Sequence, residues 1–242
     1  MEKYKHKYSG KKFPIKIYAD GPTLDEIENF DKDIIQGYTF NPTLFRKLNV
    51  TDYLGHCREV LNLCGNMLVS LEVIADGQDE MIRQARKLGE LGKNVLVKIP
   101  ISYTSGESTI NVIKTLVNNG IKLNITAVFT KKQVETILPC LSETKSIISI
   151  FSGRLFDLGL DAVGITKEIA ELIHEQSNCN ILWASPRMVY DIINACDANC
   201  DIITMQSALI NKLPLFNKLP EEYSIDTVKM FYKDAIESGY IL

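Results

Sequence analysis

The stretch 95–100, VLVKIP, decides the fold, because apolar residues follow one another in it almost without a break. A strand covered on one face alternates apolar and polar residues, whereas a strand covered on both faces is apolar nearly throughout. The proline that closes the run is at a position that a strand end tolerates. The run therefore predicts a strand buried in a parallel sheet.

Seven further runs of this kind bring the number of predicted strands to eight. They are 15–20 IKIYAD, 35–40 IQGYTF, 67–73 MLVSLEV, 123–129 LNITAVF, 147–151 IISIF, 180–185 NILWAS and 202–206 IITMQ. Longer stretches lie between them, such as 77–90 and 160–176, in which apolar residues recur at helical spacing. The chain therefore alternates strands and helices from one end to the other.

Eight strand–helix units predict an α/β fold, a single (β/α)₈ TIM barrel formed by residues 1–242. The length of 242 residues is normal for one such barrel. A doubly wound open sheet is the alternative, but no Gly-x-Gly-x-x-Gly motif follows the first strand, which counts against a dinucleotide-binding version. The tail from about residue 225 is predicted to form a last helix.

The composition points to a globular enzyme rather than a nucleic-acid or membrane protein. Hydrophobic residues make up 45% of the chain and charged residues 24%, which is enough apolar material for a large core. A formal net charge of −3 gives no field that attracts polyanions. The basic N-terminus leads into 15–20 rather than into an apolar signal core, and no apolar run is long enough to span a membrane. We therefore expect a soluble, cytoplasmic protein.

The six cysteines give little support to a metal site. Cys196 and Cys200 are four residues apart, but there is no second pair and the three histidines are scattered. Six thiols are typical of a reducing compartment, although an even number leaves disulfide bonds formally open. The sequence predicts neither a bound metal nor a cofactor.

Polar residues that a buried core would not choose lie at the predicted strand ends, where the active site of a barrel is found. They are Asp20, Glu72, Lys98, Asn124, Thr126, Ser149 and Arg154.

Lys98 is the most informative of these residues, because four apolar residues flank it in 95–99. Lysine is almost never fully buried without a partner. An amine withdrawn from water is disfavoured in its charged form, and the neutral form is a nucleophile. The alternative is that only the stem packs while the ammonium group reaches the barrel rim.

The carboxylates on neighbouring strands favour chemistry at Lys98. Asp20 and Glu72 could form a buried ion network with it, but such networks are costly to desolvate and add little stability. They could also hold a divalent metal. Paired carboxylates beside an amine instead suit Schiff-base chemistry, in which protons move on and off the intermediates. Ser149 and Gly153–Arg154 suit a phosphate group, although Arg154 taken alone could be a surface residue.

Seven segments in order along residues 15–212 resemble the transaldolase family, whose fold is a class I aldolase barrel. They are KIYADG (16–21), TFNPTL (39–44), VSLEV (69–73), LVKIP (96–100), LNITAVFT (123–130), ISIFSGR (148–154) and WASPR (183–187). Any one of them alone is a weak signal, but together they are specific.

The resemblance implies a role for each matching residue. Lys98 is the Schiff-base lysine, Asp20 takes a proton from the C4 hydroxyl of the donor, and Glu72 acts through a water molecule held by Thr126. The remaining matches concern substrate binding. Asn41 and Asn124 bind sugar hydroxyls, and Thr39 lines the same wall. Ser149 and Arg154 bind the phosphate, and Ser185 with Arg187 extends the phosphate end. The resemblance implies sugar-phosphate substrates and no metal or cofactor.

Two activities occur in the family, and two positions discriminate between them. Transaldolases transfer a dihydroxyacetone unit to an aldose phosphate, whereas the short fructose-6-phosphate aldolases release it. The aldolase pattern has Gln where this chain has Glu72 and Tyr where it has Phe151, which is expected to pack against the substrate. We therefore expect transfer from sedoheptulose 7-phosphate or fructose 6-phosphate, with aldolase activity as the alternative. A non-catalytic sugar-phosphate-binding barrel is a third hypothesis.

The chain also departs from the family pattern. Phe40 replaces a common threonine and could reshape the pocket beside Asn41, Ile150 replaces a usual proline, and 205–206 differs from the frequent Leu-Pro. An arginine that longer members supply late in the chain has no obvious counterpart. These changes leave the identity of the sugar open.

The C-terminal helix allows two interpretations of the quaternary structure. Compact members of the family can form rings through this helix, and Phe231, Tyr232, Ile236 and Tyr240 could dock onto a neighbouring subunit. Alternatively, these side chains cover the bottom of their own barrel.

Overall fold

Eight parallel strands form a closed barrel in the computed structural model, which describes residues 8, 12–216 and 218–241. The strands follow one another around the barrel in chain order, and β8 pairs with β1 to close it. They are β1 (Lys16–Asp20), β2 (Ile35–Thr39), β3 (Leu68–Glu72), β4 (Val95–Pro100), β5 (Leu123–Val128), β6 (Ile147–Ile150), β7 (Asn180–Trp183) and β8 (Ile202–Met205). The predicted (β/α)₈ barrel is therefore confirmed, and the open sheet is not found.

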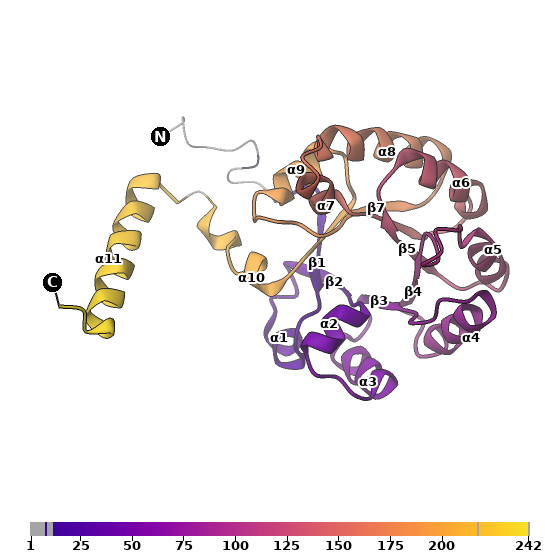
Figure 1. Ribbon diagram of the computed structural model, residues 1–242, viewed down its shortest axis with the longest axis horizontal. Coiled ribbons are helices and arrows are strands. Elements are labelled where there is room, and N and C mark those ends of the chain that lie inside the picture. Colours follow the sequence, from indigo (N-terminus) through magenta and orange to yellow (C-terminus); the bar gives the residue numbers. More distant parts are fainter. Residues whose placement is uncertain (1–7, 9–11, 217, 242) are drawn as a thin grey trace. The chain divides into compact units, whose positions relative to one another are not determined.

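Helices connect the strands and lie around the outside of the barrel (Figure 1). They are α1 (Leu24–Asn29), α2 (Pro42–Lys47), α3 (Tyr53–Cys64), α4 (Gln78–Gly89), α5 (Ile110–Asn118), α6 (Lys131–Leu141), α7 (Ser152–Asp157), α8 (Ala162–Gln176), α9 (Asp191–Asp197) and α10 (Ser207–Ile210). The apolar stripe of each longer helix packs inward, as in α4, where Met81, Ala85 and Leu88 are buried.

The near-continuous apolar runs form strands because both of their faces are covered. Side chains on one face pack inside the barrel and those on the other face pack against the helices. Inside the barrel, Tyr18, Leu96, Ile147, Leu182 and Ile202 belong to one buried cluster. This cluster forms a solid floor, so polar side chains can gather only near the strand ends.

Residues 14–210 form one compact unit, and the described residues of 1–13 and 211–242 belong to a second. The second unit contains a 3₁₀ helix (Leu213–Leu215) and the 19-residue helix α11 (Pro220–Ser238), which begins five residues before the predicted start. Within this unit the rings of Phe13 and Phe216 lie 5.7 Å apart. A single domain formed by residues 1–242 stays a prediction.

Two further properties concern the described residues as a whole. None of their helices combines the length and the apolar character that crossing a membrane requires. The six cysteines form no disulfide bond. Burial raises the pKa of the Cys57 and Cys64 thiols to about 12, so these two thiols behave as small apolar side chains.

Candidate active site

Strand register places the charged and amide residues of the site next to one another. Glu72 on β3 is level with Lys98 on β4, and Lys98 is level with Asn124 on β5. Next to β3 in the barrel are β2 and then β1, where Asp20 at the end of β1 is level with Thr39 at the end of β2. Residues at the same level of adjacent parallel strands present their side chains to the same face. The barrel thus brings together five residues that are far apart in the sequence.

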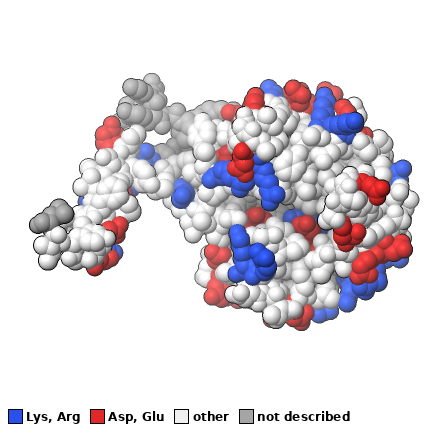
Figure 2. All heavy atoms as spheres, viewed as in Figure 1, with Lys and Arg blue, Asp and Glu red and all other residues white. Residues whose placement is uncertain are grey.

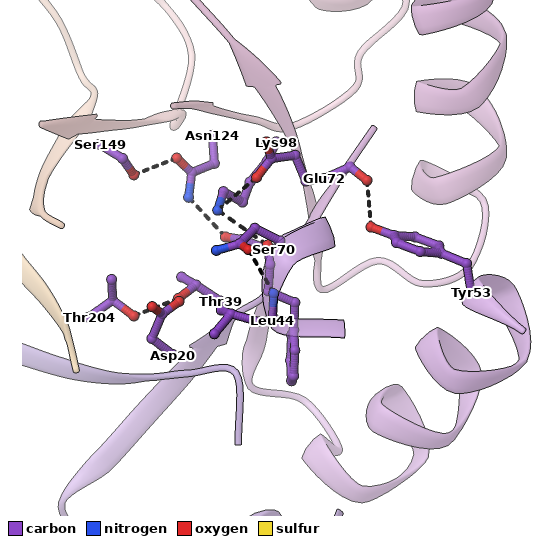
Figure 3. A network of polar contacts seen from close by, with 12 residues as sticks. Asp20, Thr39, Leu44, Tyr53, Ser70, Glu72, Lys98, Asn124, Ser149 and Thr204 are labelled. Carbon is purple, nitrogen blue, oxygen red and sulfur yellow. Dashed lines mark hydrogen bonds and ion pairs between the residues drawn. The ribbon is translucent and has the colours of Figure 1, made fainter. Parts of the chain in front are cut away.

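Lys98 is buried with its amine held between two acceptors (Figure 3). Only 6% of the residue is exposed. Its Nζ lies 3.1 Å from Oε2 of Glu72 and donates a hydrogen bond of 3.2 Å to the carbonyl oxygen of Phe40. The ammonium group does not reach the barrel rim, so the alternative in which Lys98 extends to solvent is not found.

Aromatic packing behind the amine holds both acceptors in place. The ring of Phe45 lies 5.3 Å from that of Phe40 and 4.8 Å from that of Tyr53. The Tyr53 hydroxyl donates to the carbonyl oxygen of Glu72 at 2.5 Å, and this bond fixes the end of β3. Phe40 is completely buried and does not line the cavity. It therefore contributes its carbonyl oxygen to the site, and an effect of its ring on the shape of the pocket stays a prediction.

Asp20 faces the cavity from β1 and is bound by a chain of two hydroxyl groups. Thr39 donates to Oδ1 of Asp20 at 2.6 Å, and the hydroxyls of Thr39 and Thr204 are 2.5 Å apart. Burial raises the pKa of the Asp20 carboxyl, while Lys98 and the Thr39 hydrogen bond act in the opposite direction. A carboxylate with a raised pKa is a better proton acceptor than an exposed one.

Asn124 lies in a second hydrogen-bonded chain that orients its amide. Ser149 on β6 donates to Oδ1 at 2.7 Å, and Nδ2 donates to the Ser70 hydroxyl on β3 at 3.0 Å. All three side chains are buried. The sequence analysis missed Ser70, although it lies two residues before Glu72 and so points to the same side of the strand.

The polar groups surround a cavity at the carboxyl ends of the strands. Figure 2 shows a hollow in this face of the barrel, with charged side chains at its floor and basic side chains on its rim. The residues that line the cavity are Asp20, Thr39, Asn41, Lys98, Thr126, Ser149, Phe151, Arg154, Leu182, Ala184, Ser185 and Thr204. Eleven of the twelve predicted site residues thus line the cavity or, like Glu72 and Asn124, contact residues that do; their roles stay predictions.

The placement of Asn41 at the cavity has a local cause. Asn41 is the N-cap of α2, and its Oδ1 accepts a hydrogen bond of 3.0 Å from the backbone N–H of Leu44. Its Nδ2 is the amide group that can reach a ligand in the cavity. Pro42 at the first helical position fixes the direction in which α2 leaves the site.

Arg154 and Phe151 form the cationic end of the cavity. The guanidinium carbon of Arg154 lies 5.0 Å from the centre of the Phe151 ring, so the ring supports the cation from one side. Both residues belong to the turn that begins α7, and the backbone N–H of Arg154 donates to the carbonyl oxygen of Phe151. The predicted phosphate site therefore has one cation held against the cavity.

Arg187 is the predicted site residue that the structure does not bring to the cavity. Its guanidinium group forms a two-pronged ion pair with Asp157 at the end of α7, where both side chains are about half exposed. Hydrogen bonds from Arg187 hold the pKa of the Asp157 carboxyl below its usual range. The role of Arg187 at the phosphate end stays a prediction.

No group of three or more His, Cys, Asp or Glu side chains with the spacing of a metal site occurs among residues 8, 12–216 and 218–241. The two carboxylates of the site face an amine and hydroxyl groups instead. The arrangement is that of a buried amine with one carboxylate in contact and a second across the cavity, beside amides and a cation.

Comparison with known proteins extends over nearly the whole barrel. Residues 17–239 match the model of the family described as transaldolase/fructose-6-phosphate aldolase. The chain belongs to this family. Its relatives there include a protein of Desulforapulum autotrophicum that is 30% identical over 220 residues, which are 89% of this chain and 98% of the relative. A protein of Clostridium acetobutylicum is 30% identical over 225 residues, which are 90% and 100% of the two chains. Both carry the name "probable transaldolase".

Solved structures outside the transaldolase/fructose-6-phosphate aldolase family share the fold alone. The thiamine phosphate pyrophosphorylase of Pyrococcus furiosus superposes with a TM-score of 0.54 at 12% identity, covering 81% of this chain and 87% of its own. Such low identity carries no information about the reaction.

Proposed function

We propose that the chain is a transaldolase that moves a dihydroxyacetone unit from a ketose phosphate to an aldose phosphate through a Schiff base on Lys98. The observation that carries this proposal is the buried Lys98 amine, 3.1 Å from the Glu72 carboxylate, at the floor of a cavity that contains Asp20. Family membership narrows the chemistry to an aldolase-type enzyme. Sedoheptulose 7-phosphate and fructose 6-phosphate are the donors we propose.

In the first step Lys98 attacks the ketose carbonyl. Its proton passes to Glu72, the base in contact with it, and the neutral amine forms a carbinolamine at C2. Loss of the C2 hydroxyl as water then gives the iminium ion. We propose that Thr126, whose side chain lines the cavity, holds the water molecule through which Glu72 supplies and removes protons.

In the second step the carbon–carbon bond breaks. Asp20 takes the proton of the C4 hydroxyl, the C4 oxygen becomes an aldehyde, and the C3–C4 electron pair forms the enamine as the iminium nitrogen becomes neutral. The aldose phosphate leaves. An acceptor aldehyde then takes the same pair, Asp20 returns its proton to the new hydroxyl, and water releases the product ketose from Lys98.

Substrate binding uses the remaining groups of the cavity. We propose that Asn41, Asn124 and Thr39 bind sugar hydroxyls, and that Ser149, Arg154 and Ser185 bind the phosphate. Arg154 offers a planar guanidinium that matches a phosphate dianion. Arg187 would bind the phosphate after breaking its ion pair with Asp157.

Phe151 favours transfer over release. It lines the cavity but has no hydroxyl with which to protonate the enamine, so a bound dihydroxyacetone unit has to wait for an acceptor. Glu72 also favours transfer, because the aldolases have Gln at this position.

Borohydride trapping tests the proposal. With fructose 6-phosphate and borohydride, we expect a dihydroxyacetone adduct on Lys98 by mass spectrometry, and glyceraldehyde 3-phosphate added before the borohydride should discharge it. Lys98 without a label would contradict the proposal. Free dihydroxyacetone appearing without acceptor as fast as transfer occurs with one would select the aldolase. Ligand-induced thermal stabilisation without any adduct would select the non-catalytic barrel.

We also propose that the chain forms a homo-oligomer through α11. Many large apolar side chains of this helix are more than half exposed, among them Val228, Phe231, Tyr232 and Ile236. Patches of this kind mark interaction surfaces. A sizing column should give a multiple of the monomer mass, and Phe231→Glu with Ile236→Glu should shift elution to the monomer. A native protein that elutes as a monomer would refute this proposal.

We propose that the protein acts in the carbohydrate metabolism of the cytoplasm, because the proposed reaction acts on phosphorylated sugars. Exchange of three-carbon units among phosphorylated sugars belongs to the pentose phosphate pathway, and we propose that the chain acts there. It would need neither a metal, a cofactor, a nucleic acid nor a membrane.

A further inference from the structure

Thr204 on β8 is a buried polar residue of the cavity to which neither the sequence analysis nor the proposed mechanism gives a role. Only 4% of the residue is exposed, and it lines the same cavity as Asp20 and Lys98. Strand β1 lies between β8 and β2 in the barrel, so Thr204 and Thr39 approach each other from the two neighbours of the strand that carries Asp20. Two hydrogen bonds join the three side chains in a row with Thr39 in the middle, and Figure 3 shows the three close together.

Counting protons sets the direction of the hydrogen bonds in this row. A threonine hydroxyl has one hydrogen and can accept at its lone pairs. Thr39 gives its hydrogen to Oδ1 of Asp20 at 2.6 Å. The contact of 2.5 Å between the Thr39 and Thr204 hydroxyls therefore uses the hydrogen of Thr204. The row runs from Thr204 to Thr39 to Asp20, with each hydroxyl donating toward the carboxylate.

This direction has a consequence for Asp20. A donor already directed at the Thr39 oxygen prevents the Thr39 hydroxyl from rotating toward Thr204, so its hydrogen stays on Oδ1. With Oδ1 occupied, Oδ2 is the oxygen left to take a proton from a ligand in the cavity. Because the Thr204 hydroxyl already donates its hydrogen to Thr39, it is a poor donor to substrate.

We infer that Thr204 is a positioning residue that acts through Thr39 to hold the Asp20 carboxylate in the orientation required for proton transfer. This inference rests on the proposed function, because it assumes that Asp20 takes the C4 proton. It predicts an effect on the step that breaks the carbon–carbon bond and little effect on imine formation with dihydroxyacetone, since that reaction breaks no such bond.

Thr204→Val tests the inference, because valine keeps the branched shape and removes the hydroxyl. We expect kcat for transfer from fructose 6-phosphate to fall about tenfold while KM changes less than about twofold, since positioning acts on the reaction barrier rather than on binding. The adduct trapped from dihydroxyacetone and borohydride should remain at the native level. Thr204→Ser should restore most of kcat, because serine returns the hydroxyl.

Thr166→Val is the matched control. Thr166 is also completely buried, and its hydroxyl is bonded to Ser152 at 2.7 Å, outside the cavity. We expect Thr166→Val and Thr204→Val both to lose stability, because each removes a buried hydrogen bond, but only Thr166→Val should keep the native kcat. If Thr204→Val does not fold, Thr204→Ser and Thr204→Ala provide the same comparison, since they differ in the hydroxyl and not in the methyl group.

The outcomes separate the two proposals. A native protein that forms no adduct on Lys98 would refute the proposed function. A native protein that forms the adduct, together with a folded Thr204→Val variant that transfers at the native rate, would refute the role of Thr204 alone. A loss of kcat equal in Thr204→Ser and Thr204→Ala would refute it as well, because the hydroxyl would then be irrelevant.

Discussion

Lys98→Met is expected to abolish the trapped adduct and to lower the rate of transfer by roughly 10³-fold or more, because the covalent route is removed and only binding remains. Methionine has a stem of similar length and fills the space of the lysine without its amine. The measurement is the coupled transfer rate together with intact mass after borohydride. An adduct that survives at full yield in this variant would place the nucleophile elsewhere.

The same substitution has a second expected effect, on stability. Glu72 would lose its partner at 3.1 Å in a site where its side chain is only 18% exposed. Removing one partner of a buried ion pair costs about 3 kcal/mol, because an uncompensated charge remains. Thermal melting near neutral pH should show this loss.

The double variant Lys98→Met with Glu72→Gln separates the two effects. It removes both charges and leaves the Tyr53 bond intact, since that bond uses the Glu72 carbonyl oxygen. We expect stability to recover most of the loss while activity stays absent. A double variant as unstable as Lys98→Met would show that the ion pair is not the source of the effect.

Much of the fold could be predicted, because a parallel strand that is covered on both faces appears in the sequence as a nearly continuous apolar run. The eight apolar runs match the eight strands to within two residues at each end, since burial on both faces leaves few positions for polar residues. The same rule made Lys98 conspicuous. A polar side chain that interrupts such a run needs partners, and register supplies Glu72 and Asn124 on either side.

The rest of the site depends on contacts that the sequence pattern does not carry. Threonine is common in strands for reasons of shape, so Thr204 in 202–206 gave no signal. Arg187 matched a motif, but its partner Asp157 lies 30 residues earlier and reaches it only once α7 and the loop after β7 have folded together. Pairings of this kind follow from three-dimensional packing.

Gly153→Ala is expected to destabilise the protein by about 3–4 kcal/mol, because a Cβ atom has no space at this position. It would lie 1.6 Å from the carbonyl oxygen of Ser185 and 2.5 Å from its carbonyl carbon. These are backbone atoms, which cannot rotate away as the end of a side chain can. The Gly153 N–H also donates to the carbonyl oxygen of Ala184, so the two segments are held together.

Gly89→Ala is the matched control for the loss of a glycine. Both residues are helical and neither has a positive φ, but a Cβ at Gly89 would meet only side-chain atoms, the nearest at 3.6 Å. This is ordinary van der Waals contact, and alanine is the better helix former by roughly 0.5–1 kcal/mol. Gly89→Ala should therefore be neutral or slightly stabilising.

The backbone of Ser185 lies so close to Gly153 that packing explains why this position is a glycine. The sequence analysis assigned Gly153 to a phosphate site, whereas in the structure the absence of a Cβ atom lets α7 approach the segment after β7. Ser185, which has a positive φ of 58°, faces the cavity at this junction. A Cβ that separates the two segments would therefore move both Arg154 and Ser185. We expect Gly153→Ala to lower the melting temperature by roughly 10 °C. It should also raise KM for the phosphorylated donor more than KM for dihydroxyacetone. Equal changes in the two KM values would contradict this account.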